Sequence, residues 1–196
     1  LIIYSCLIMS VSLQAQEHFA DRYNVSYITM DNGLPHNFID DIYKDTYGFL
    51  WISTAGGGLS RYDGYEFINF NTNAPHCKLK SNFIRNVYED SFQRLWIVSE
   101  GGTDIIDLST LQSVVPAAPR GVLSRLINQP AHTVILDSQG CIWLQCNNAL
   151  HRITFNAKGD IDTLSTLDLP ELSEPDLTLK DIDEDGKIWA GINGPI

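Results

Sequence analysis

One seven-residue pattern occurs four times in this chain of 196 residues, and its spacing limits the folds that the chain can adopt. Each copy begins with Asp and ends with Trp six residues later, and the four tryptophans are 45, 47 and 46 residues apart. Glycine stands at the fourth position of three copies, and Gln93 replaces it in the second. A fixed period of this length indicates a repeat architecture. The recurrent residues are Asp45, Gly48, Trp51, Asp90, Trp96, Asp137, Gly140, Trp143, Asp183, Gly186 and Trp189.

The first repeat unit shows what each copy folds into. Residues 38–44, 49–54, 59–62 and 66–70 are short runs rich in Ile, Phe, Tyr and Trp, with turn residues between them. Such runs predict four strands joined by hairpins. A lone sheet with apolar residues on both faces cannot bury them, whereas copies stacked around an axis can. The sequence therefore predicts an all-β fold, an incomplete β-propeller with four-stranded antiparallel blades.

The repeat also divides the chain. We expect blade 1 over residues 34–78, blade 2 over 79–121, blade 3 over 122–176 and a partial blade 4 over 177–196. Residues 16–33 form an N-terminal segment, in which Tyr23 to Met30 resembles the last strand of a unit. We expect that strand to complete the final blade of a ring, because closing a ring removes the open sheet edges.

The recurrent residues have structural explanations. The Asp carboxylate can accept backbone N–H groups two residues further on and fix the turn between the first two strands. Glycine supplies the positive φ that such a turn often needs. The Trp begins the second strand and should pack between neighbouring blades, where burial of 150–250 Å² contributes at most about 4–6 kcal/mol. We therefore expect packing, rather than ligand stacking, to explain the four tryptophans.

The beginning of the chain resembles an export signal. Residues 1–13 are apolar and uncharged, and the small residue Ala15 precedes a polar sequence. This pattern predicts a signal peptide over residues 1–15, cut from a sequence that is truncated at its start, and the alternative is a buried N-terminal element. Three cysteines would remain after cleavage. Cys141 and Cys146 are roughly 16 Å apart on one predicted strand, too far for a disulfide, so we expect small packing residues with free thiols.

Charge and motifs exclude several functions. The net charge of −11 disfavours binding to nucleic acid or to anionic lipid. The motif search predicts no catalytic residues, no cofactor site and no metal site. Asp40 and Asp41 are adjacent on a strand and are expected on opposite faces, which excludes an acid–base pair. Residues 181–186 imitate the start of a calcium loop, but Ile192 stands where an EF-hand needs Glu.

One binding hypothesis comes from two equivalent asparagines. Asn37 and Asn82 stand where the chain enters the first strand of units 1 and 2. They could line one mouth of the axial channel beside His36 and Glu100 and contact a sugar there. The alternative is that each Asn bonds its own turn.

The unit from Leu34 to Phe67 resembles the two-component regulator propeller repeat. The leader-like start, with Asp31-Asn-Gly-Leu-Pro35 after it, also resembles the beginning of hybrid two-component sensors of Bacteroidetes-type bacteria. The resemblance covers about Tyr23 to Gly191. It implies two seven-bladed propellers outside the inner membrane, so that this chain holds about three and a half blades of the first. It also implies a membrane helix, a cytoplasmic histidine kinase, homodimerisation, and glycan fragments as ligands that switch on genes for glycan use.

The leading hypothesis is therefore a periplasmic sensor segment with no enzyme activity of its own. Its partners would be the remaining blades and domains of a parent sensor histidine kinase, and an oligosaccharide ligand. A secreted propeller enzyme, either a lyase or a glycosidase, and an envelope scaffold are the alternatives. An enzyme would require polar residues that converge on the mouth of the channel.

Overall fold

The computed structural model describes residues 26–118, 122–146, 149–168 and 177–192. The predicted signal peptide over residues 1–15 lies outside this part, as do Tyr23 to Val25 of the expected closing strand. In the part described, no helix is long and apolar enough to cross a membrane.

Three four-stranded antiparallel sheets follow one another along the chain, each with its strands in sequence order. The strands of blade 1 are β1 (Ile39–Lys44), β2 (Leu50–Thr54), β3 (Gly58–Tyr62) and β4 (Phe67–Phe70). The strands of blade 2 are β5 (Ile84–Glu89), β6 (Arg94–Ser99), β7 (Gly102–Asp107) and β8 (Gln112–Ser113). The strands of blade 3 are β9 (Ala131–Leu136), β10 (Ile142–Cys146), β11 (Ala149–Phe155) and β12 (Ile161–Asp168). A hairpin of β13 (Leu177–Ile182) and β14 (Ile188–Ile192) follows as blade 4.

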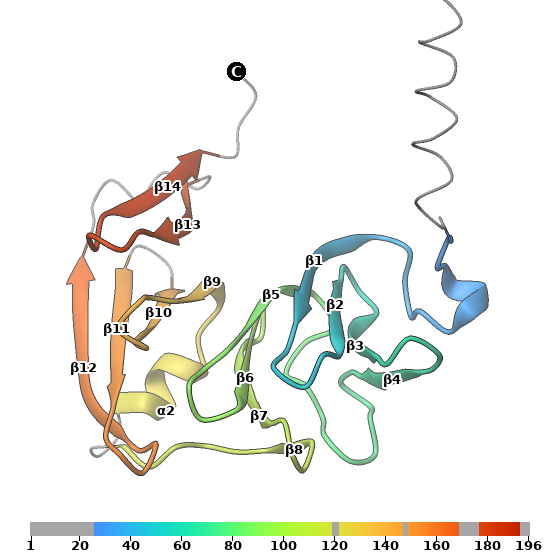
Figure 1. Cartoon of the computed structure of the whole chain (residues 1–196), viewed down its shortest axis with the longest axis horizontal. Coiled ribbons are helices and arrows are strands. Elements are labelled where there is room, and N and C mark those ends of the chain that lie inside the picture. Colours follow the sequence, from blue (N-terminus) through green and yellow to red (C-terminus); the bar gives the residue numbers. More distant parts are fainter. Residues whose placement is uncertain (1–25, 119–121, 147–148, 169–176, 193–196) are drawn as a thin grey trace, which may run out of the picture.

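The blades are arranged in an arc, with blade 1 on the right of Figure 1, blade 2 in the middle and blades 3 and 4 on the left. The first strands of successive sheets contact one another, β1 with β5, β5 with β9, and β9 with β13. The first strand of each blade is therefore the one at the axial side of the arc. This architecture confirms the predicted all-β fold, an incomplete propeller of four-stranded antiparallel blades.

The apolar core lies between blades rather than within them. Trp51 of blade 1 belongs to a buried cluster with Ile84, Val87 and Leu95 of blade 2. Trp96 of blade 2 belongs in the same way to a cluster built largely from blade 3. Because each sheet is apolar on both faces, this stacking removes from water the surface that a single blade would expose.

A short α-helix lies between the strands of blades 2 and 3 in the described part of the chain. The helix α2 (Val122–Ile127) precedes β9, and its Leu123 and Leu126 are buried in the cluster between blades 2 and 3. Lys80 donates from Nζ to the carbonyl oxygen of Ile127 over 2.7 Å, so a cation stabilises the C-terminal end of this helix.

The expected closing strand is not formed in its described part. Residues 26–29 belong to no regular element, and Met30–Asn32 form the 3-10 helix η1. Thr29 caps this turn through a capping box with Asn32, and Gly33 ends it in the left-handed conformation with φ 105°. No described strand pairs with residues 26–30, and a strand without a neighbour cannot satisfy its backbone hydrogen bonds. Local capping therefore determines the conformation here.

The three cysteines of the described chain, Cys77, Cys141 and Cys146, are buried and unpaired. Burial raises the thiol pKa of all three, and that of Cys146 rises to about 12. They act as small apolar residues, as expected from the sequence.

Candidate functional site

The recurrent aspartates use both carboxylate oxygens inside their own blade. In every copy, Oδ2 accepts a hydrogen bond from the indole Nε1 of the Trp six residues later, over 2.7–3.0 Å. In every copy, Oδ1 accepts from the backbone N–H four residues later, and in blades 2 to 4 also from the one two residues later. The carboxylate therefore joins the turn to the tryptophan. The Asp–Trp bond was missed at the sequence level.

The spacing of six residues contained the signal for that bond. Tyr43 pairs with Trp51 across β1 and β2, and Asp45 N–H donates to the carbonyl oxygen of Phe49 at the end of the ladder. Asp45 is thus two residues from the direct partner of Trp51 and lies on the same face. Diagonal neighbours of this kind are within reach of long side chains.

The tryptophans differ in burial according to what packs against them. Trp51 and Trp96 are 0% exposed, and Trp143 is partly buried beside Leu179 and Ile182 of blade 4. Trp189 of blade 4 is 58% exposed. Each of the first three contacts the following blade, which is the packing role that the sequence suggested.

The fourth position of the turn has a left-handed backbone in every copy. Gly48, Gly140 and Gly186 have φ values of 93°, 77° and 78°, and Gln93 has φ 58°. A side chain at such φ is strained, so the second copy carries a cost that the other three avoid. Gln93 Oε1 accepts a hydrogen bond from the Tyr47 hydroxyl of blade 1 over 3.1 Å, which ties the two turns together.

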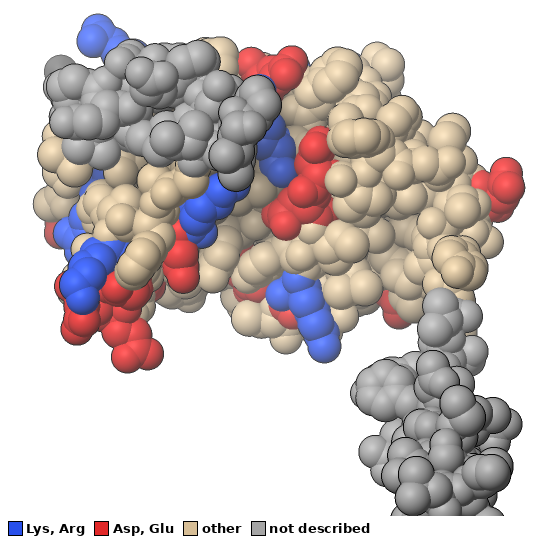
Figure 2. Space-filling model, turned by 90° about the horizontal axis from the view of Figure 1, so that it is seen from above, with Lys and Arg blue, Asp and Glu red and all other residues tan. Residues whose placement is uncertain are grey.

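A cavity of about 570 Å³ opens at the axial side, between the first strands of all four blades. Figure 2 shows acidic and basic side chains close together near the centre of the face seen from above. A concave site with few convergent polar groups is the usual form of a small-molecule site. Six charged or titratable residues line the cavity: Asp40, Asp41, Arg85, Glu100, His132 and Lys180.

A β-bulge in each first strand explains how these side chains converge. In β1, Ile39 pairs with Thr54 and Asp41 with Ser53, so Asp40 is the extra residue. Arg85 and His132 are the extra residues at the equivalent positions of β5 and β9, five residues before the recurrent Asp. In β13 the irregularity lies two residues later, at Lys180. A bulge re-aims side chains that strict alternation would separate.

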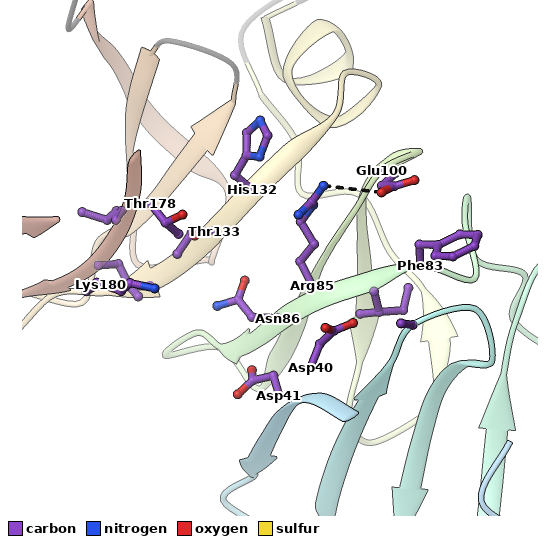
Figure 3. A pocket seen from close by; sticks show the side chains of 14 residues that line it. Asp40, Asp41, Phe83, Arg85, Asn86, Glu100, His132, Thr133, Thr178 and Lys180 are labelled. Carbon is purple, nitrogen blue, oxygen red and sulfur yellow. Dashed lines mark hydrogen bonds and ion pairs between the residues drawn. The ribbon is translucent and has the colours of Figure 1, made fainter. Parts of the chain in front are cut away.

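The bulge overturns one expectation. Asp40 and Asp41 do not point to opposite faces of the sheet, because both line the cavity (Figure 3). The rule of alternation fails at these two residues because one residue of β1 has no partner in β2.

The residue after each bulge bonds the next blade. Asp41 Oδ2 accepts from the backbone N–H of Val87 over 3.3 Å. Asn86 makes two bonds to Val134, accepting from its N–H over 3.1 Å and donating to its carbonyl oxygen over 3.0 Å. These side chains clamp neighbouring first strands together, whereas the bulged residues point into the cavity.

Charged groups of both signs line the cavity, and Glu100 stands beside Arg85. Asp40 and Asp41 come from β1, and Arg85, His132 and Lys180 come from β5, β9 and β13. Burial raises the pKa of both carboxyl groups; the positive charge of Arg85 opposes the shift at Asp40, and the negative charge of Asp40 adds to it at Asp41. Burial lowers the pKa of His132, and the neighbouring Arg85 lowers it further.

The asparagines proposed to contact a sugar have other partners. Asn37 Oδ1 accepts from Met30 N–H over 3.0 Å, and Asn82 Oδ1 accepts from Thr72 N–H over 2.9 Å. Neither lines the cavity, and His36 Nδ1 accepts from Phe38 N–H. Of that group only Glu100 lines the cavity. Each asparagine carboxamide holds an earlier segment of the chain, seven or ten residues away, rather than its own turn, which was the alternative at the sequence level.

The calcium-like segment is similarly engaged. Asp183 accepts three N–H bonds, and Asp185 pairs with Lys187 Nζ at 3.2 Å. Among the residues that the structure describes, no group of three or more His, Cys, Asp or Glu side chains is placed to hold a metal ion.

Comparison with known proteins agrees with this repeat geometry. The two component regulator propeller family matches residues 33–56 and 78–101, each of which ends just after the second strand of a blade. Two segments of this chain therefore match the two-component regulator propeller repeat. No curated protein matches the sequence.

Solved structures share the fold of these repeats. The extracellular domain of a "putative hybrid two component system" from B. thetaiotaomicron is 20% identical, with a TM-score of 0.61 over 85% of this chain and 29% of that one. That of a "putative one component system" from the same organism is 20% identical, with a TM-score of 0.50 over 88% and 31%. A streptogramin B lyase is 15% identical, with a TM-score of 0.51 over 89% and 58%. The chain thus spans about a third of the length of the first two.

Proposed function

We propose that this chain is the extracytoplasmic sensor segment of a two-component signalling protein, and that it recognises glycan fragments at its axial cavity. The regulator propeller repeats support a signalling role, and the shared fold includes extracellular domains of such systems. In this proposal the chain is exported by the signal peptide over residues 1–15. It dimerises within the whole sensor and controls transcription through a histidine kinase, and it carries out no chemistry of its own.

The lining of the axial cavity supports sugars as the class of ligand. Its lining combines carboxylates, a guanidinium, an imidazole and an ammonium, groups that donate to or accept from hydroxyls. Phe83 adds an aromatic ring that is 51% exposed. Polar groups of both kinds beside an aromatic surface suit a sugar, which offers hydroxyls at its edge and C–H groups on its faces.

The gene provides a direct test of the signalling part. We expect the reading frame beyond Ile196 to encode further blades, one membrane helix and a histidine kinase. A stop codon directly after a completed propeller would contradict a sensor and favour the secreted enzyme or the scaffold.

The glycan part needs a test in cells. RNA sequencing of wild-type and deletion strains, each given a panel of plant and animal glycans, should show one glycan whose gene response requires this protein. An identical response of both strains to every glycan would contradict glycan sensing.

A further inference from the structure

The two bulged residues Arg85 and His132 place a guanidinium and an imidazole side by side at one end of the axial cavity. They come from neighbouring blades, and Figure 3 shows both side chains directed to the same end of the cavity. Lys180 lies on the β13 side of the same cavity. Three basic or protonatable groups from successive blades therefore face one space.

The partner of Arg85 in the structure is weak. Glu100 Oε1 is 3.4 Å from Arg85 Nη2, and both side chains are about half exposed, at 57% and 45%. Exposed pairs at this distance are screened by water and contribute little. The guanidinium can form two parallel bonds with a carboxylate, and the single contact with Glu100 leaves that capacity unused.

The neighbouring first strand, β1, supplies carboxylates to the same lining. Asp40 is a bulged residue that lines the cavity, whereas its neighbour Asp41 is engaged by Val87 N–H. A ligand that spans the cavity would meet a carboxylate acceptor on the β1 side, and guanidinium and imidazole donors on the β5 and β9 side. An acidic sugar has both complementary parts, since its hydroxyls donate and its carboxylate accepts.

We propose that the axial cavity binds an acidic oligosaccharide, with its carboxylate between Arg85 and His132 and its hydroxyls donating to Asp40. The proposal rests on the proposed glycan-sensing function and adds the ligand's charge and the residues that select it. The bulged position of each first strand is thereby the specificity-determining position, and the residue after it holds the blades together.

Calorimetric titration of the protein tests this with matched probes. Digalacturonic acid and its dimethyl ester differ in the two carboxylate charges and in two small methyl groups, and the unsaturated disaccharides of unsulfated chondroitin and of chondroitin sulfate compare a carboxylate alone with a carboxylate plus sulfate. We expect at least one acidic disaccharide to bind. Arg85→Gln and His132→Gln should each weaken that binding at least tenfold, and Asp40→Asn should weaken it less.

The control is Lys78→Gln, which removes an exposed positive charge away from the cavity and should leave binding unchanged. Arg85→Lys should recover part of the affinity, because it restores the charge without the planar fork. Each variant must melt within 2 °C of the parent, so that loss of binding is not loss of folding.

Three results would overturn the proposal: equal binding of the acid and its ester, unchanged affinity in Arg85→Gln, or no binding of any acidic disaccharide. Displacement of the sugar by equimolar inorganic sulfate would also overturn it, since that shows a simple anion site. A third kind of result separates the two proposals. If an uncharged oligosaccharide binds and Arg85→Gln does not weaken that binding, the acidic character of the ligand is contradicted, but glycan sensing is not. A glycan response that does not require this protein would instead contradict the proposed function.

Discussion

The clamps between first strands provide a sharp test, because two blades use different side chains at the same repeat position. Asn86 makes two bonds to Val134, and Asp41 makes one to Val87. The carboxylate of Asp41 cannot donate to the Val87 carbonyl oxygen, whereas a carboxamide can. We therefore expect Asp41→Asn to stabilise the protein by adding the bond that Asn86 already makes.

The size of the effect follows from these contacts. One additional hydrogen bond contributes about 0.5–1.5 kcal/mol. For a chain of this length, each kcal/mol shifts the melting temperature by about 2–4 °C. The reverse change, Asn86→Asp, removes the donor to Val134 and places a negative charge beside its carbonyl oxygen, which should cost about 1–3 kcal/mol.

The effect should depend on pH. Burial raises the pKa of Asp41 in the folded protein, so folding disfavours its charged form. The free-energy cost of burying the charged carboxylate of Asp41 is absent below the unfolded-state pKa of about 4, and it is complete above the raised folded-state pKa. The advantage of Asp41→Asn should therefore grow as the pH rises from 3 through that window and then remain constant.

Differential scanning calorimetry at pH 3.5 and pH 7 is the assay, with Asp40→Asn as the matched control. That substitution removes the same charge from the adjacent residue, which donates to and accepts from no backbone group in the described hydrogen bonds. A melting temperature at pH 7 that falls in Asp41→Asn, or rises equally in both variants, would refute the clamp.

Three further outcomes follow from the turns and the core. Asp90→Asn should cost about 3–5 kcal/mol by urea unfolding, because Arg94 is paired with it at 2.7 Å in a buried site and would keep an uncompensated charge. The exposed Asp183→Asn should cost much less, and equal costs would contradict the difference in burial. Gln93→Gly should stabilise by about 0.5–1 kcal/mol in the same assay, since relief of the left-handed strain outweighs one exposed hydrogen bond; destabilisation would show that the Tyr47 contact dominates. The three buried cysteines should not react with a thiol reagent at pH 8 until the protein is unfolded, and rapid labelling of the native protein would contradict their burial.

The turns could be predicted from the sequence because they are local. Asp, Gly and Trp at fixed offsets determine a hairpin whose partners lie within six residues, so strand bounds such as β1 at Ile39–Lys44 came within a residue or two of expectation. The Asp–Trp bond is local in the same sense, because Tyr43 pairs with Trp51 and Asp45 is two residues beyond Tyr43.

The axial site could not be predicted in the same way. Its residues are about 46 positions apart in the sequence, and they meet only because successive blades stack. The side chain of Asp40 lines the cavity because of a bulge, which is a property of the pairing between β1 and β2 and has no signature in the residues themselves. The two asparagines looked functional because they recur, yet each accepts a backbone N–H of an earlier segment, which is a structural role.

A crystal structure of the protein with a bound acidic disaccharide tests most directly the division between residues that build the blades and residues that face the axis. We expect the sugar in the axial cavity, with its carboxylate on Arg85 and His132, a hydroxyl on Asp40, and every Asp–Trp bond unchanged. A sugar stacked on the recurrent tryptophans, or bound away from the first strands, would contradict this assignment.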